Sequence, residues 1–369
     1  MTAPRTIVLA ALLLAPPAGE TTASPPDGGP APGAAPIQVV STIPDFAAVA
    51  RQIGGDLVEA RAIALGNQDP HFVLPKPSFA LMLRRADLFI TTGLDLEMWA
   101  PTLIDKARNR SIVEGSDGYI AVSAGVDLMD VPTQGVDRSS GEIHVYGNPH
   151  FHTSPVEIKQ VAWNITLGLQ RVDPANEDAY QEGLEDFRTR IDEAFYGPEL
   201  AAAADPEELD ARVRDRTLID YLEQTEVEGR PLIDRLGGWL KEAMPMRGHR
   251  IIAYHKNWNY FARDFGLQVV EYVEPKPGIP PSARHVKHII DEIERLGIPL
   301  MLVANYFEKD TPMKIQERTG VSAVMLPLSV TGEEGVETLF DLYDLWVDRV
   351  LEALAERETD EADGKGPIR

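Results

Sequence analysis

Short apolar runs with strand character alternate with helical segments in two separate blocks of this sequence, and this alternation constrains the fold more than any other feature. Strand-like runs lie at residues 37–42, 58–65 and 87–92 in the first block, and at 250–254, 268–273, 300–304 and 323–326 in the second. The segments between them carry apolar residues at the helical spacing of three and four. Strands that alternate with helices form βαβ units on a parallel sheet. The sequence therefore predicts an α/β protein with two lobes, each built on its own parallel sheet.

A long helical stripe lies between the two blocks. Its large apolar residues recur at spacings of three and four, namely Tyr180, Leu184, Phe187, Ile191 and Phe195. Residues at this spacing share one face of a helix. A proline at 174 is typical of a helix start, and the Gly-Pro pair at 197–198 is typical of a stop. One long helix over residues 173–196 is therefore predicted to join the two lobes.

The length of 369 residues and a hydrophobic fraction of 44% favour two cores over one. The expected organisation follows from the two blocks and the stripe between them. It comprises an N-terminal lobe at 37–172, the linking helix at 173–196, a charged insertion at 197–247, a C-terminal lobe at 248–358 and an acidic tail at 359–369.

The first residues have the order of a secretory signal peptide. Arg5 precedes an apolar run at 7–15 that is too short to span a bilayer, and prolines and small residues follow it. A signal peptide is predicted over 1–23 and a flexible Pro- and Gly-rich leader over 24–36. The sequence contains no cysteine to carry a lipid anchor. We therefore expect a soluble, non-lipidated protein of the periplasm, and a monomer.

Charge and composition exclude several classes of partner and site. The formal net charge is −23, which disfavours nucleic acid and anionic membrane surfaces as main partners, because both require clustered Lys and Arg. The absence of cysteine removes disulfides, thiolate metal sites and cysteine nucleophiles. A metal site in this chain must use histidine, carboxylate, amide or water.

Three of the eight histidines stand in distinctive settings. His71 lies in an Asp-Pro-His triplet, His150 in an Asn-Pro-His triplet before a predicted helix, and His255 at the carboxyl end of a predicted strand. Neutral imidazole is the most common side-chain metal ligand and suits zinc. The other histidines look less informative. His285 and His288 share a helix face without a visible third ligand, and His249 is expected in a loop.

Several motifs, in this order, resemble the zinc- and manganese-type periplasmic solute-binding proteins of metal ABC importers. They are Asp69-Pro-His-Phe-Val-Leu-Pro-Lys-Pro-Ser, Ala86-Asp-Leu-Phe-Ile-Thr-Thr-Gly-Leu-Asp-Leu-Glu-Met-Trp, Asn148-Pro-His-Phe-His-Thr-Ser-Pro, His255-Lys-Asn-Trp-Asn-Tyr-Phe-Ala-Arg-Asp-Phe-Gly-Leu and Glu274-Pro-Lys-Pro-Gly-Ile-Pro-Pro-Ser. The resemblance covers roughly residues 39–351. It implies two α/β lobes joined by one long helix, with a metal ion held in the cleft between them.

The resemblance also implies which residues hold the metal. The first, second and third metal histidines of the family fall on His71, His150 and His255. At the fourth position, where the family commonly has the Asp of a Leu-Asp-Pro-Leu run, this sequence has Leu326. The fourth ligand is then water or a substitute, for which the candidates are His152, Tyr306 and Glu308. Loss of a carboxylate ligand favours zinc over manganese.

Two further segments depart from the family pattern. The loop over 130–148 holds acids but only one histidine, His144, so we expect it to have at most a weak role in capturing metal. The charged insertion exceeds the family's usual connection into the second lobe and is expected to be a surface elaboration.

The predicted function is capture of a divalent metal, with zinc the main candidate, and its delivery to an inner-membrane ABC permease. A periplasmic metallochaperone is a candidate loading partner. A manganese- or iron-binding member of the same family is the nearest alternative. A zinc hydrolase or hydratase is another, because three histidines and a water also form a catalytic arrangement. Donors from both lobes favour binding over catalysis, so we expect no enzyme.

Overall fold

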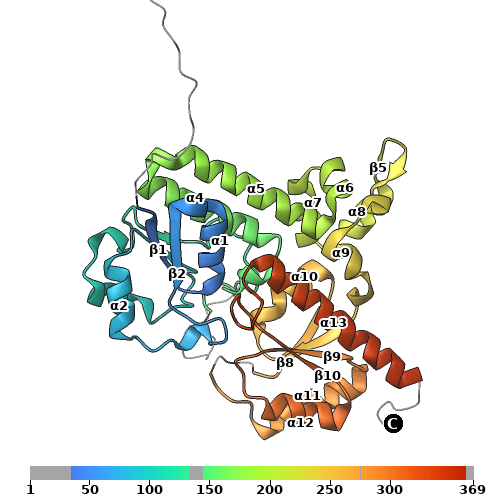
Figure 1. Ribbon diagram of the computed structural model, residues 1–369. Coiled ribbons are helices and arrows are strands. Elements are labelled where there is room, and N and C mark those ends of the chain that lie inside the picture. Colours follow the sequence, from blue (N-terminus) through green and yellow to red (C-terminus); the bar gives the residue numbers. More distant parts are fainter. Residues whose placement is uncertain (1–34, 133–143, 275, 277, 363–369) are drawn as a thin grey trace, which may run out of the picture. The chain divides into compact units, whose positions relative to one another are not determined.

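The computed structural model describes residues 35–132, 144–274, 276 and 278–362, which belong to one compact unit, Ala35–Arg369. The predicted signal peptide, nearly all of the predicted leader, most of the acidic loop before Asn148 and the last seven residues of the acidic tail lie outside the described residues. The prediction of two parallel-sheet lobes is confirmed (Figure 1).

The N-terminal lobe is built on a four-stranded parallel sheet in the order β2-β1-β3-β4. Its strands are β1 (Ile37–Ser41), β2 (Val58–Ala62), β3 (Leu88–Thr91) and β4 (Tyr119–Ala121). The helices of this lobe are α1 (Pro44–Gly54), α2 (Pro77–Arg84), α3 (Ala100–Ala107) and α4 (Glu157–Val172). Neither β4 nor α3 is visible in the sequence pattern. A three-residue strand of partly buried residues has too little periodicity to detect.

The C-terminal lobe repeats the same winding. Its parallel sheet has the order β10-β9-β7-β8, made of β7 (Arg250–Ala253), β8 (Gln268–Tyr272), β9 (Leu300–Ala304) and β10 (Ser322–Leu326). Its helices are α10 (Asn259–Phe265), α11 (Ala283–Leu296), α12 (Asp310–Thr319) and α13 (Leu339–Ala362). In each sheet the chain winds outward from the first strand and then returns to its other side. Ligands of open α/β sheets bind at the carboxyl ends of strands at such a switch point.

The helix α5 (Glu177–Tyr196) links the lobes, as the apolar stripe predicted. All five stripe residues are buried, and Gly197 ends the helix with a φ of 85° that favours glycine. A short 3-10 turn at Pro174–Asn176 precedes the helix, so the helix begins a few residues later than expected.

The predicted insertion is a helical segment between α5 and β7. It contains α6 (Pro198–Ala203), α7 (Pro206–Arg214), α8 (Leu218–Gln224), the strand pair β5 (Glu226–Val227) and β6 (Arg230–Pro231), and α9 (Gly238–Glu242). Its apolar residues join the main hydrophobic cluster, so this segment is part of the core and not only a surface elaboration.

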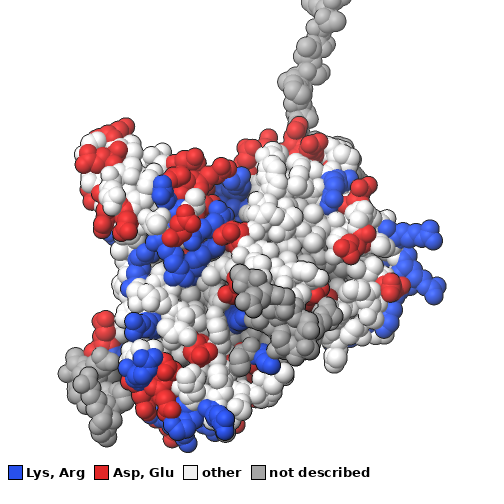
Figure 2. All heavy atoms as spheres, turned by 180° about the vertical axis from the view of Figure 1, so that it is seen from behind, with Lys and Arg blue, Asp and Glu red and all other residues white. Residues whose placement is uncertain are grey.

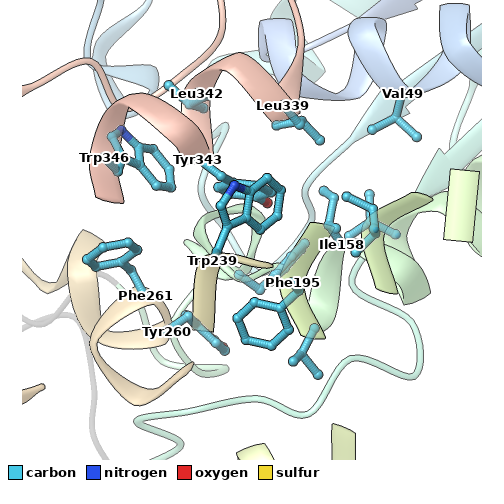
Figure 3. Packing of buried hydrophobic residues seen from close by; sticks show 14 of the residues in the cluster. Val49, Ile158, Phe195, Trp239, Tyr260, Phe261, Leu339, Leu342, Tyr343 and Trp346 are labelled. Atoms are coloured by element: carbon cyan, nitrogen blue, oxygen red, sulfur yellow. The ribbon is translucent and has the colours of Figure 1, made fainter. Parts of the chain in front are cut away.

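The largest hydrophobic cluster among the described residues runs through both lobes and the insertion, and each lobe has a smaller cluster of its own. Figure 3 shows Val49 of α1 and Ile158 of α4 from the N-terminal lobe in the same cluster as Tyr343 and Trp346 of α13. Trp239 of α9 lies between them, with its ring centroid 5.2 Å from that of Tyr343. The two sheets are therefore separate, whereas the core that supports them is shared.

No helix among the described residues is both long enough and apolar enough to cross a membrane.

Candidate metal centre

Four histidine side chains converge at the carboxyl ends of the strands. His71, His144, His150 and His255 each offer a ring nitrogen, and these nitrogens all lie within 4.8 Å of one another. All four residues are at most 9% exposed. The three histidines singled out by the sequence are therefore brought together, and His144 joins them.

The Asx-Pro-His triplets explain how the two loops of the N-terminal lobe aim their histidines. Asp69 Oδ1 accepts a hydrogen bond from the His71 backbone N–H at 2.9 Å, and Asn148 Oδ1 accepts one from the His150 N–H at 3.0 Å. An Asp or Asn side chain that bonds the backbone two residues later closes a tight turn, and proline between them restricts the chain further. Each histidine thus leaves its turn in a fixed direction.

His255 comes from the other lobe. It follows β7, an interior strand of its sheet, and immediately precedes a 3-10 turn at Lys256–Trp258. Its Nδ1 lies 3.4 Å from the backbone oxygen of Glu274, so Nε2 remains available as the metal donor. The cluster therefore includes donors from both lobes.

The expectation that His144 has at most a weak role is not supported by its position. Its Nε2 lies 3.0 Å from Nε2 of His71, and the residue is 6% exposed. The one sequence signal for this placement is that His144 lies six residues before His150 of the Asn-Pro-His triplet. A short loop between them can bring both imidazoles to the same site.

Asp69 orients the His71 ring as well as its backbone. Its Oδ1 lies 2.6 Å from Nδ1 of His71. Burial alone would raise the pKa of Asp69, but the hydrogen bonds and charge of His71 outweigh it and hold that pKa below its usual range. An ionised carboxylate at Nδ1 keeps a proton there and leaves the Nε2 lone pair free toward the cluster.

Burial keeps the other three imidazoles neutral. It lowers the pKa of His144 to about 2 and that of His255 to about 3, with the neighbouring His71 adding to both shifts. The pKa of His150 also falls well below its ordinary value, for the same two reasons. Neutral imidazole is the form that binds a metal ion.

Several ring nitrogens of the cluster have no hydrogen-bond partner within the described part of the chain. They are Nδ1 of His144, both nitrogens of His150 and Nε2 of His255. A buried polar atom without a partner costs about 1–3 kcal/mol. Tetrahedral zinc with Zn–N bonds of about 2.0–2.1 Å would set its donor nitrogens about 3.3 Å apart, so small inward shifts suffice. The donor set fits a metal ion.

The residues considered for the fourth ligand position are not members of the group of four histidines. Leu326 is fully buried in the core at the end of β10, and Glu308 is exposed. Burial raises the pKa of Tyr306 well above its ordinary value, so its phenol stays protonated. His152 is fully buried, and neither of its ring nitrogens joins the group of four.

The remaining histidines lie outside the cluster, as expected. His285 Nε2 lies 2.7 Å from the backbone oxygen of Tyr272, and His288 Nε2 lies 3.6 Å from Glu271 Oε2 on the surface. The backbone N–H of His249 donates to the backbone oxygen of Met246.

Two parallel-sheet lobes with an imidazole cluster at their strand ends define a two-lobed protein that can hold one metal ion. The sequence model of the family described as zinc-uptake complex component A, periplasmic, matches residues 39–224 and 232–357, and the chain belongs to this family.

Curated relatives agree over nearly the whole length. The iron-binding protein YfeA of Yersinia pestis is 23% identical over 343 residues, which are 91% of this chain and 92% of the relative. The manganese ABC transporter substrate-binding lipoprotein PsaA of Streptococcus anginosus is 21% identical, over 86% of this chain and 89% of the relative.

Solved structures share the fold. A zinc-bound ZnuA lacking residues 138–173 of its own chain superposes with a TM-score of 0.62 at 20% identity, covering 86% of this chain and 98% of that one. The solute-binding protein FpvC of Pseudomonas aeruginosa, in complex with Mn²⁺, gives 0.61 at 20% identity, covering 87% and 99%.

The protein is therefore a metal-binding substrate-binding component of an ABC transporter, of an extracytoplasmic family that implies a membrane permease as partner. The family consists of solute-binding proteins, so the alternative of a zinc hydrolase or hydratase is wrong. Relatives named for iron and for manganese leave the identity of the metal open.

Proposed function

We propose that His71, His144, His150 and His255 bind one zinc ion as the transported cargo. The observation that carries this proposal is the group of four buried imidazoles, whose donor nitrogens lie within 4.8 Å of one another. The group contains no carboxylate. Four donors and no remaining open position describe a closed, tetrahedral site for binding.

The donor set favours zinc over the metals named for the relatives. Nitrogen ligands suit zinc, whereas manganese prefers carboxylate, carbonyl and water oxygens. YfeA is named for iron and PsaA for manganese. In this chain Leu326 occupies the position at which the family resemblance placed a carboxylate, and an imidazole from another loop supplies the fourth donor instead.

Zinc is therefore expected to displace manganese from the purified protein at equimolar concentrations and to bind at least a hundredfold more tightly. The all-nitrogen donor set is the physical reason. Competition titration with a chromophoric chelator measures both affinities. Equal or tighter binding of manganese would rule out the zinc proposal while leaving the site itself intact.

Zinc binding should release at most one proton per ion between pH 5 and pH 7. Three of the four imidazoles are already neutral in this range because burial lowers the pKa of His144, His150 and His255. Metal binding releases a proton only from a donor nitrogen that is still protonated. Calorimetric titration in buffers of different ionisation enthalpy counts the released protons. A value of two or more would mean that the metal-free cluster is open to water.

Delivery is proposed to follow the transport class of the family. The loaded protein hands its ion to an inner-membrane ABC permease, works as a monomer, and reaches the periplasm without a lipid anchor because the sequence has no cysteine. Loading by a metallochaperone is compatible with this scheme and is not required by it. Zinc-limited growth of a deletion strain, restored by the wild-type chain but not by a His150→Ala variant, tests the function as a whole.

A further inference from the structure

A second polar pocket lies away from the histidines, where the insertion meets the C-terminal lobe. It has a volume of about 390 Å³. Its charged lining residues are Arg216 from the turn between α7 and α8, Arg247 before β7, and Arg263 and Asp264 of α10. Figure 2 shows a concentration of Lys and Arg side chains between the insertion and this lobe, bordered by acidic ones.

The backbone holds Arg216 over this pocket. The residue has a φ of 59°, a left-handed conformation that a non-glycine residue adopts only at a cost. Two backbone hydrogen bonds fix the turn, from Arg216 to Val213 and from Thr217 to Arg212. The Arg216 Nη1 then donates to the backbone oxygen of Leu267, at 3.3 Å, so the insertion reaches across to the second lobe.

Arg247 lies against the backbone of Gly266. A Cβ atom at position 266 would come within 2.8 Å of Nη1 of Arg247, so a larger residue there would displace this guanidinium. Neither Arg216 nor Arg247 forms an ion pair with a carboxylate in the part of the chain that the structure describes. Both therefore bring positive charge to the pocket without a direct ion pair to a carboxylate.

Carboxylates next to this pocket are paired with other guanidinium groups. Arg263 and Arg214 are held by Glu157 and Asp264, at distances of 2.8 to 2.9 Å. Arg263 also lies 3.5 Å from Asp127, so three carboxylates pair with Arg214 and Arg263, and none of the three forms an ion pair with Arg216 or Arg247. Burial, and then repulsion from Arg216, lowers the pKa of Arg247, and burial and Arg263 do the same for Arg216. Asp220 attracts Arg247 without forming an ion pair with it.

We propose that this pocket binds a small oxyanion of the phosphate type between Arg216 of the insertion and Arg247 of the C-terminal lobe. The chain carries a net charge of −23, so anions are repelled from most of the molecule. At this pocket, by contrast, a bound anion would reduce the repulsion between the guanidinium groups of Arg216 and Arg247. Guanidinium presents a planar fork of donors that matches phosphate oxygens.

A bound anion would link the insertion to the C-terminal lobe. A bound oxyanion accepts hydrogen bonds from Arg216 and from Arg247 together, and the exposed amide of Gln268 lines the same pocket. The insertion would then be fixed against the C-terminal lobe more firmly in phosphate than in chloride. The histidine cluster lies outside this pocket, so metal affinity should not depend on the anion.

The test uses the full mature protein and inorganic phosphate as the probe. Isothermal titration with phosphate, at ionic strength matched with sodium chloride, is compared for wild type, Arg247→Met and Arg216→Met. Arg230→Met is the matched control, because Arg230 is exposed in the same insertion and lies outside the pocket. Zinc titration of each variant verifies that the fold is retained.

The proposal expects saturable phosphate binding to wild type and to Arg230→Met, a loss of at least tenfold in affinity for each pocket variant, and unchanged zinc binding in all four proteins. No saturable phosphate binding by wild type, or an equal loss in Arg230→Met, would overturn it.

A second arm separates a free anion from a lipid headgroup, which offers the same phosphate chemistry. Flotation with phosphatidylglycerol vesicles is expected to leave the protein unbound at physiological ionic strength, because acidic residues border the pocket and the chain carries a net charge of −23. Arg247-dependent vesicle binding without binding of free phosphate would overturn the assignment to a small ligand.

Discussion

Replacing His255 by alanine is expected to weaken zinc binding by about two to three orders of magnitude. Structural zinc sites with four donors contribute about 10–16 kcal/mol of apparent binding free energy, so one donor accounts for several kcal/mol. The same loss is expected for His144→Ala, the histidine that the sequence pattern did not single out. Competition titration with a zinc chelator measures both variants.

Two controls make this result specific. His285→Ala removes an imidazole from α11 whose Nε2 contacts a backbone oxygen outside the cluster, and should leave zinc affinity within about twofold. His152→Leu removes a buried imidazole two residues from His150, and should leave it within a few-fold because His152 does not join the group of four. Wild-type affinity in His255→Ala would mean that the second lobe supplies no donor, and capture between two lobes would have to be abandoned.

Asp45→Asn is expected to stabilise the protein at alkaline pH by up to about 4 kcal/mol. Asp45 lies in the first turn of α1 and is fully buried. Ser329 and the backbone of Val330, from the C-terminal lobe, face its carboxyl group, but no hydrogen bond of standard geometry reaches either oxygen. Burial, opposed only weakly by those groups, raises the pKa of Asp45 to about 7 from 3.8.

The sign of the effect follows from this raised pKa. Between about pH 4 and pH 7 the folded protein keeps a proton on Asp45 that the unfolded chain has released, so this group makes folding less favourable as the pH rises. Asparagine mimics the protonated form at every pH. Urea unfolding at pH 4.5 and pH 8 should therefore show a small gain for Asp45→Asn at the lower pH and the full gain at the higher one.

Asp56→Asn serves as the matched control, since Asp56 is exposed in the turn after α1, and its stability difference should be near zero at both pH values. A destabilised Asp45→Asn at pH 8 would show that the buried carboxylate is ionised and compensated in the native state.

Long, periodic segments of this protein could be predicted from sequence because local pattern and tertiary burial agree there. All five residues of the α5 stripe are buried, and the seven predicted strands correspond to β1, β2, β3, β7, β8, β9 and β10. The strand β4 escaped because three partly buried residues carry no readable period. Its place at the sheet edge depends on pairing with β3, which is a long-range contact.

The histidine site was predictable where a local turn fixes the side chain. Asp69 and Asn148 lie two residues before His71 and His150, and that spacing is visible in the sequence. His144 has no such turn of its own. It reaches His71 across 73 residues of sequence, so its place depends on the packed fold. The family resemblance at Leu326 predicted that one donor was missing, but it did not indicate which loop would replace it.

The core shared by the two lobes has a consequence for how the protein unfolds. Apolar side chains of α1 and α4 pack in the same cluster as those of α9, α10 and α13 (Figure 3). Each lobe also has a smaller cluster of its own, but neither lobe can unfold without exposing the shared one. A lobe expressed alone would expose this surface to water and should aggregate. The intact chain should melt in one cooperative calorimetric transition, with equal van't Hoff and calorimetric enthalpies. Cargo bound at the strand ends then raises the melting temperature of the whole molecule, including the insertion far from the ion.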